Sequence, residues 1–148
     1  MDTVIVQLPA PEPEMAARRC PEPEVTPVLP AAVLKAESGF DPNAARPETG
    51  EYGIAMWTPS VFEAWGKAGT HAGPKSYGDP GDAIAAMGKY ACRLDQQMKG
   101  HGLTRDLPAL VAAACRTSDK TVAAAGAVPE RLRHHVDKVL QYLHDYGG

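Results

Sequence analysis

The sequence lacks any apolar run long enough to cross a membrane, and it lacks an excess of positive charge. Hydrophobic residues make up 44% of its 148 positions, which is enough for the core of one globular domain. The formal net charge is −3, so we expect neither nucleic acid nor an anionic lipid surface as a partner. A membrane span is not expected either.

The first residues also lack the features of a general export signal. Asp2 stands where such a signal carries positive charge, and the run Val4-Ile5-Val6 is shorter than its apolar segment. We therefore expect a trimmed mature form, a protein that is released by another route, or one that stays inside the cell.

Cysteine is scarce, and its spacing matches no zinc motif. Cys20, Cys92 and Cys115 allow one disulfide and one free thiol, and the sequence does not decide the pair. A bond between Cys20 and Cys92 would attach the N-terminal arm to the domain and leave Cys115 free. The histidines form no His-Glu-x-x-His pattern, and no Gly-x-Ser-x-Gly turn is present. We expect no metal and no other cofactor.

Proline is concentrated at the N-terminus, where half of the 14 prolines lie within the first 30 residues. This composition predicts an extended, proline-rich arm over residues 1–19. The compact domain is expected over residues 20–148. Beyond the first few residues no segment alternates apolar and polar positions, so the pattern predicts a mainly α fold.

Proline, glycine and capping residues set the expected helix boundaries. Residues 41–53 are rich in Pro, Asn, Gly and acidic residues, and they predict an irregular or small hairpin lobe. The expected helices run from Pro27 to Gly39, from Pro59 to Gly66, from Pro80 to Gly100, from an Asp106 cap through Ala114, from Ser118 or Asp119 to Gly126, and onward past Pro129.

Glu37 lies in the last turn of the first expected helix, where the partial negative charge of the helix end disfavours a carboxylate. The same position suits a general acid, because apolar neighbours and a negative helix end favour the protonated carboxyl group. Taken alone, this stretch favours a solvated glutamate in a fraying turn. Other motifs decide between the two interpretations.

Four motifs in order resemble the lytic transglycosylase (SLT) family of the lysozyme-like superfamily, in the form typical of actinobacterial and phage members. Glu37-Ser38-Gly39-Phe40 is similar to its acid motif, and Gly53-Ile54-Ala55-Met56-Trp57-Thr58-Pro59 to its Gly-Ile/Leu-x-Gln segment. Asp79-Pro80-Gly81-Asp82 resembles the following loop, and Gly126-Ala127-Val128-Pro129 the closing segment. The resemblance covers roughly residues 20–146 and implies a compact lysozyme-like helical domain.

The resemblance implies cleavage of the β-1,4 bond between MurNAc and GlcNAc in peptidoglycan. Glu37 would protonate the glycosidic oxygen and then act as base, so that the sugar's own 6-hydroxyl forms an anhydro end. No second carboxylate is then needed, and we interpret Asp41 as a turn residue and Glu51 as a solvated loop acid. The resemblance implies glycan strands of peptidoglycan as the partner, and the cell envelope or the outside of the cell as the place of action. It implies a monomer or a component of a wall-penetrating assembly.

Several positions depart from the family pattern. The family's glutamine falls on Met56, its Tyr-Asn pair on Cys115 and Arg116, and a tyrosine of the last motif on His135. Two interpretations follow: an enzyme in which Arg116 or His135 supplies replacement contacts, or a weakened or inactive module that binds glycan or a protein partner. The intact acid motif favours the enzyme.

Aromatic residues near the motifs are candidates for stacking on sugar rings. Tyr52 is the better candidate because glycines on either side keep its loop open, whereas Trp57 suits core and cleft equally. The predicted site has Glu37 as its catalytic residue. Its predicted substrate-binding residues are Ser38, Tyr52, Met56, Trp57, Tyr77, Arg116 and His135.

Overall fold

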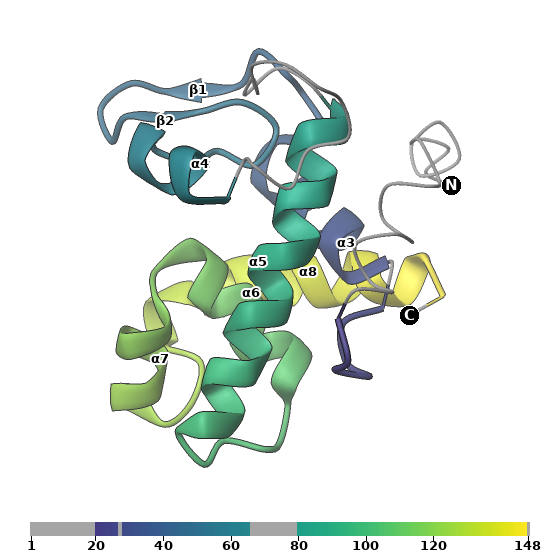
Figure 1. Ribbon diagram of the computed structural model, residues 1–148, viewed down its shortest axis with the longest axis vertical. Coiled ribbons are helices and arrows are strands. Elements are labelled where there is room, and N and C mark those ends of the chain that lie inside the picture. The colour runs from purple at the N-terminus through teal and green to yellow at the C-terminus, as the bar shows by residue number, and fades with distance from the viewer. Residues whose placement is uncertain (1–19, 27, 66–79, 148) are drawn as a thin grey trace.

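The computed structural model describes residues 20–26, 28–65 and 80–147, so the predicted arm over residues 1–19 lies outside the described residues. The chain is mainly helical within these ranges and contains one short hairpin (Figure 1), as the sequence predicted. The elements are α3 (Val28–Ser38), β1 (Ala45–Arg46), β2 (Glu51–Tyr52), α4 (Pro59–Trp65), α5 (Pro80–Gly100), α6 (Leu107–Arg116), α7 (Asp119–Ala125), η2 (Glu130–Leu132) and α8 (Arg133–Asp145).

The helices begin and end near the predicted capping, proline and glycine residues, with one correction. Gly39 ends α3 with φ 66° and donates its N–H to Lys35 O at 2.9 Å. Ser118 caps α7, since its Oγ accepts the Thr121 N–H at 3.0 Å. Asp106 precedes α6 as expected, but its backbone has φ 55° and its side chain makes no capping hydrogen bond. The apolar face of α6 therefore accounts for that helix better than a cap does.

Helix α5 is the element around which the others are arranged. In Figure 1 the hairpin and α4 lie beside its upper part, α6 and α7 lie beside its lower part, and α8 crosses behind. On one face of α5, Met87, Ala91 and Met98 are each fully shielded from solvent. Helices α3, α6 and α8 pack around the same core. This packing brings the end of α3 next to α8.

The hairpin confirms the small lobe that was expected over residues 41–53. Strands β1 and β2 pair antiparallel, with Ala45 opposite Tyr52 and Arg46 opposite Glu51. The chain then turns at once, and Tyr52 exchanges two backbone hydrogen bonds with Trp57, at 2.9 and 3.1 Å. The turn between them folds back over the end of α3.

A disulfide joins Cys20 to Cys92, with their Cα atoms 5.7 Å apart, and leaves Cys115 as a free thiol. Of the possible pairs, this is the one that attaches the N-terminal side of the domain to α5. Among the helices over the described residues, none has both the length and the apolar character that a membrane crossing requires.

Candidate active site

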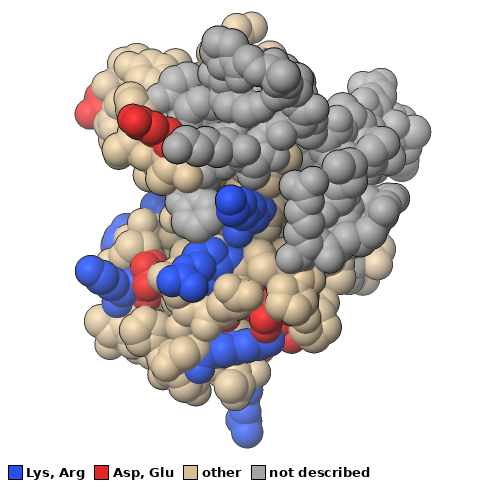
Figure 2. All heavy atoms as spheres, in the orientation of Figure 1, with Lys and Arg blue, Asp and Glu red and all other residues tan. Residues whose placement is uncertain are grey.

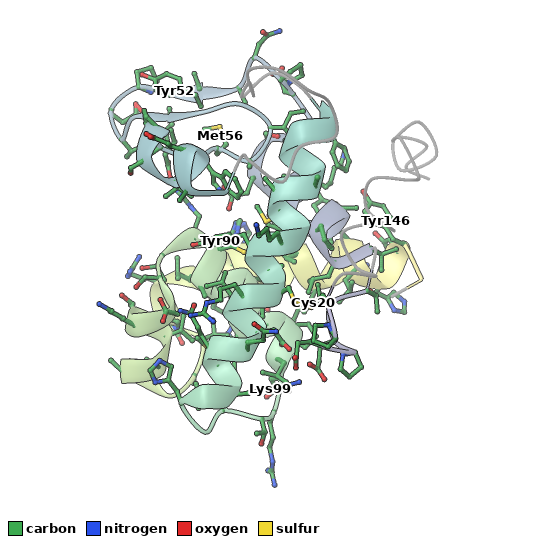
Figure 3. All side chains as sticks on the ribbon, in the orientation of Figure 1. Cys20, Tyr52, Met56, Tyr90, Lys99 and Tyr146 are labelled. Carbon is green, nitrogen blue, oxygen red and sulfur yellow. A yellow bond between two sulfur atoms is a disulfide. The ribbon has the colours of Figure 1, made fainter. Side chains whose placement is uncertain are left out.

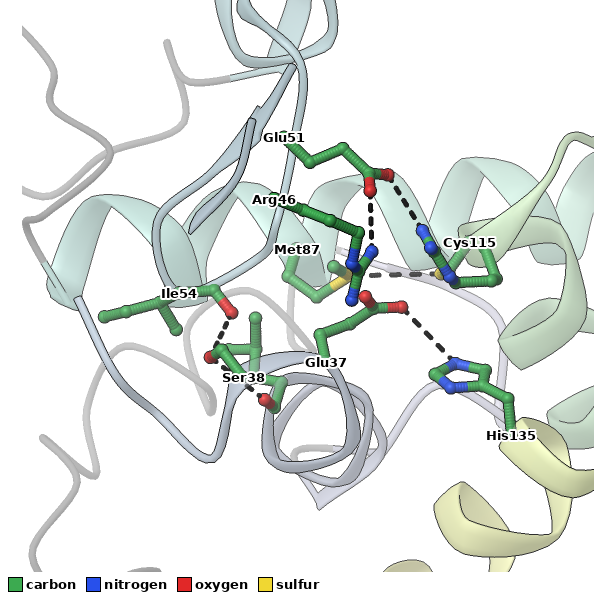
Figure 4. A network of polar contacts seen from close by, with 10 residues as sticks. Glu37, Ser38, Arg46, Glu51, Ile54, Met87, Cys115 and His135 are labelled. Atoms are coloured by element: carbon green, nitrogen blue, oxygen red, sulfur yellow. Dashed lines mark hydrogen bonds and ion pairs between the residues drawn. The ribbon is translucent and has the colours of Figure 1, made fainter. Parts of the chain in front are cut away.

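Glu37 lies at the C-terminal end of α3, and the fold turns its side chain inward. Only 4% of that side chain is exposed, so it is not a solvated glutamate in a fraying turn. In Figure 4 its carboxylate lies between His135 of α8 and Arg46 of the hairpin. The acid motif therefore places one carboxyl group in a mostly dehydrated position at the meeting point of three elements.

His135, the third residue of α8, is a polar neighbour of Glu37. Its Nε2 lies 3.3 Å from Glu37 Oε2, which is an ion-pair contact when the imidazole is protonated. That nitrogen is buried and has no hydrogen-bond partner among the described residues. Glu37 is thus the polar group to which His135 lies close.

Ser38 connects the end of α3 to the hairpin lobe. Its Oγ donates a hydrogen bond of 2.6 Å to the carbonyl of Ile54, in the turn between Tyr52 and Trp57. A second, longer contact of 3.5 Å reaches Leu34 O. The hydroxyl is therefore engaged in holding the lobe at a set distance from Glu37, and this is the role that the contacts assign to it.

Glu51 is not the solvated loop acid that the sequence suggested, because only 16% of its side chain is exposed. One oxygen accepts from Arg46 at 2.6 Å, and the other accepts from Arg116 Nη1 at 2.8 Å. Thr49 donates a further hydrogen bond of 2.8 Å. Burial alone would raise the pKa of Glu51, but its three donors outweigh this effect and lower the pKa. Glu51 is thus a fixed anion that joins the hairpin to α6.

Arg116 lies between two carboxylates. Burial alone would lower the pKa of its guanidinium, but the hydrogen bond to Glu51 and the nearby charge of Glu37 outweigh this effect and raise the pKa. Arg116 therefore stays cationic beside the acid. A permanent positive charge in this place stabilises Glu37 most when Glu37 is ionised.

Cys115 is unsuited to be a nucleophile. Burial raises the pKa of its thiol, and the charge of Glu37 raises it further. Its sulfur lies 4.0 Å from Met87 Sδ, in the core side of α6.

The remaining predicted residues divide by exposure. Tyr52 is 38% exposed on the outside of the hairpin lobe, whereas Met56 and Trp57 are each about 5% exposed (Figure 3). Trp57 packs edge to face against Tyr90, with ring centroids 5.5 Å apart. Of core and cleft, the structure assigns Trp57 to the core, and both buried side chains have little surface for direct ligand contact. Tyr77 lies outside the described residues.

The sequence interpretation missed Arg46, Thr49 and the interior position of Glu51. The pair of Arg46 and Glu51 could have been predicted from the expected hairpin. The two residues lie opposite each other on its strands, where opposite charges form pairs. The contact with Arg116 carried no local signal, because α6 is distant along the chain. Asp41 is the turn residue that was expected, accepting the Asn43 N–H at 2.8 Å.

A surface hollow of about 520 Å³ lies elsewhere, between the loop after α5 and the start of α8. Leu103, Arg105 and Arg133 are among the residues that line it, and it contains none of the predicted site residues. Within the described residues, the candidate active site is therefore the group around Glu37. It consists of the nearly buried carboxyl group of Glu37, the imidazole of His135, and the guanidinium of Arg116, which Glu51 holds.

Comparison with known proteins identifies the family. The family model of the transglycosylase SLT domain matches residues 15–124, and these include the acid motif, the hairpin and α6. A search of the curated proteins and a search of the solved structures found no match. The family implies peptidoglycan as the substrate and the cell wall as the site of action. By the extent of the match, together with a mainly helical fold that presents Glu37 at the end of α3, this chain belongs to the transglycosylase SLT domain family.

Proposed function

We propose that this chain cleaves the β-1,4 bond between MurNAc and GlcNAc, with Glu37 as its sole acid and base. The observation that carries the proposal is the position of Glu37: a family-motif carboxyl group, 4% exposed, beside His135 and Arg116. A carboxyl group in that position is a candidate to exchange a proton with a bound glycan.

The reaction needs one proton to move out and one to return. Protonated Glu37 donates to the glycosidic oxygen as the bond from that oxygen to the anomeric carbon breaks. The resulting carboxylate then takes the proton of the sugar's 6-hydroxyl as that oxygen attacks the anomeric carbon. The product ends in an anhydro ring, water is not consumed, and Glu37 is protonated again.

The neighbours of Glu37 suit the ionised intermediate stage. Once the proton has left, the Arg116 cation stabilises the carboxylate, and a protonated His135 adds to this effect. Glu51 is held by Arg46 and Arg116, so it is not available as a nucleophile for a two-carboxylate mechanism. We infer that Arg116 and His135 replace the contacts that the family's asparagine and tyrosine make.

We further propose that Tyr52 stacks on a sugar ring, and that Met56 and Trp57 act from beneath by shaping the turn. Tyr77 remains a predicted contact, and the finer role of Ser38 is to hold the lobe.

Lys and Arg side chains lie across the middle of the face shown in Figure 2, below the hairpin lobe. Such charges suit the carboxylates of wall peptides.

The experiment is digestion of purified peptidoglycan, with mass spectrometry of the soluble products. We expect anhydro-muropeptides from the parent, and a loss of at least about 100-fold in Glu37→Gln, because the amide keeps the shape but has no acidic proton. Glu63→Gln, an exposed position on α4, is the matched control and should retain activity. Cleavage by Glu37→Gln at the parent's rate would remove Glu37 from the mechanism. Products heavier by one water would show a hydrolase instead.

A second candidate is a module that binds wall glycan without turnover. Its support is that Arg116 is already paired with Glu51, and that Met56 cannot make the hydrogen bonds of an amide. No soluble products from a protein that still pellets with the wall would favour it. In that case Met56→Gln together with Arg116→Asn should restore some cleavage.

The place of action and the assembly are further proposals. We infer an activity at the cell envelope or outside the cell. We expect a monomer or a component of a wall-penetrating assembly. Light scattering of the purified chain tests the first of these states.

A further inference from the structure

Besides the disulfide, a cluster of charged side chains attaches residues 20–26 to α5. Glu22, Glu24 and Asp95 bring carboxylate oxygens within 4.8 Å of one another. Lys99 Nζ lies among them, 2.5 Å from Glu22, 2.8 Å from Glu24 and 3.5 Å from Asp95. Figure 3 labels Lys99 at the lower end of α5, away from the hairpin lobe. We name these four residues the acidic clasp.

The acidic clasp holds more negative than positive charge when every group is ionised, because three carboxylates then face one ammonium. Asp95 is fully buried at 0% exposure, so its charge has little help from water. A buried charge without full compensation is costly. A neutral form of one carboxyl group removes part of this cost.

The hydrogen bonding leads to the same conclusion. Both oxygens of Asp95 and Oε1 of Glu24 are buried, and within the described residues they accept no well-directed hydrogen bond. Lys99 Nζ offers only charge to Glu24 Oε1 and Asp95 Oδ2, because its contacts with them do not have hydrogen-bond geometry. Two ionised carboxylates cannot bond to each other, because neither has a proton to donate. One proton on Asp95 supplies a donor to Glu24 and satisfies oxygens from both residues.

We propose that Asp95 keeps a proton and donates it to ionised Glu24, so that the attachment of residues 20–26 to α5 depends on pH. Among the described residues, the charged groups that act on Asp95 are Glu24 from the N-terminal segment and Lys99 from α5 itself. Glu22 joins through Lys99, and the neutral Gln96 contacts Glu22 at 3.5 Å. Lys99 occupies the position that a bound metal ion would need.

The direction of the pH dependence follows from which form the fold favours. Burial first, and then the bond to Glu24, raises the pKa of Asp95 from 3.8 to about 7. A raised pKa means that the stabilisation is complete below pH 3.8 and is lost as the pH rises through about 7. The same bond lowers the pKa of Glu24 below 4.5, so Glu24 opposes this trend only in acid. The clasp is therefore tight below neutral pH and weaker above it.

The test compares the thermal unfolding of the full chain and of Asp95→Asn between pH 5.5 and 8.5. The amide N–H of the variant donates at every pH, as the protonated acid does. We expect the Tm of the parent to fall relative to the variant by about 5 °C across this range. Asp137→Asn, on the exposed side of α8, removes the same charge and should follow the parent.

A local measurement assigns the change to the segment. The Val25 N–H donates to Glu22 O at 3.2 Å, and Val25 is 3% exposed. Its amide exchange, corrected for base catalysis, should accelerate at pH 8.5 in the parent but not in Asp95→Asn.

Three results would overturn the proposal. The first is a Tm difference between parent and Asp95→Asn that does not change with pH. The second applies if that variant fails to fold. It is a midpoint near 4 in an NMR titration of the Asp95 carboxyl carbon in the parent. The third is Ca²⁺ at pH 8.5 stabilising the parent selectively, because a metal ion and not a proton would then offset the excess charge.

Discussion

At the residue scale, Ser38 links the end of α3 to the hairpin lobe through its hydroxyl. Ser38→Ala removes the 2.6 Å hydrogen bond to Ile54 O and leaves a buried carbonyl without that donor. We expect a loss of about 1–2 kcal/mol in the free energy of unfolding, measured in urea. Ser60→Ala, an exposed position on α4, is the control and should change stability by much less. Equal losses in both variants would show that the bond to Ile54 contributes nothing specific.

Glu51 provides a pH prediction at the same scale. Its folded pKa is lowered, so its contribution is present above its ordinary value of 4.5 and is lost as the pH falls through the folded value. Glu51→Gln should therefore be about 1–2 kcal/mol less stable than the parent at pH 7, with a difference that shrinks toward pH 3. Urea unfolding at several pH values measures this. A difference that stays constant would mean that the two arginines do not hold an ionised Glu51.

At the scale of elements, the disulfide links the segment before α3 to the middle of α5, across a sequence separation of 72 residues. Closing so long a loop restricts the unfolded chain, and we expect its reduction to cost about 2–4 kcal/mol. Urea unfolding with and without reductant measures the effect in a Cys115→Ser background, which removes the free thiol. The Cys20→Ser, Cys92→Ser variant should match the reduced protein and should not respond to reductant. A midpoint that is the same before and after reduction would contradict the prediction.

At the scale of the whole molecule, stability should come from the core shared by α3, α5, α6 and α8 rather than from the acid. Leu29 is completely buried in this core, and Leu29→Ala should lower the free energy of unfolding by about 2–5 kcal/mol. Glu37→Gln should change it far less, since it conserves shape and removes no apolar burial. Guanidinium unfolding of both variants compares the two. A larger loss in Glu37→Gln would show that the site also carries the fold.

The helices were readable from the sequence because their signals are local. Pro59, Gly39 and Ser118 act on the backbone next to them, and an apolar stripe such as that of α5 shows in residues three and four apart. The same holds for Glu37 as the candidate acid, since its motif and helix-end position are contiguous in the chain. Asp106 was the exception, because its left-handed backbone depends on how the chain enters α6.

By itself, then, the sequence determined the helical class and most helix boundaries, and it singled out Glu37 as the candidate acid. The tertiary structure alone decided which cysteines pair, that His135 lies 3.3 Å from Glu37, and that Trp57 is buried. It also turned Glu51 from a loop acid into the anion between Arg46 and Arg116. The physical reason is that propensity and capping act within a few residues, whereas burial and ion pairing depend on distances between side chains that only the packing of distant elements sets.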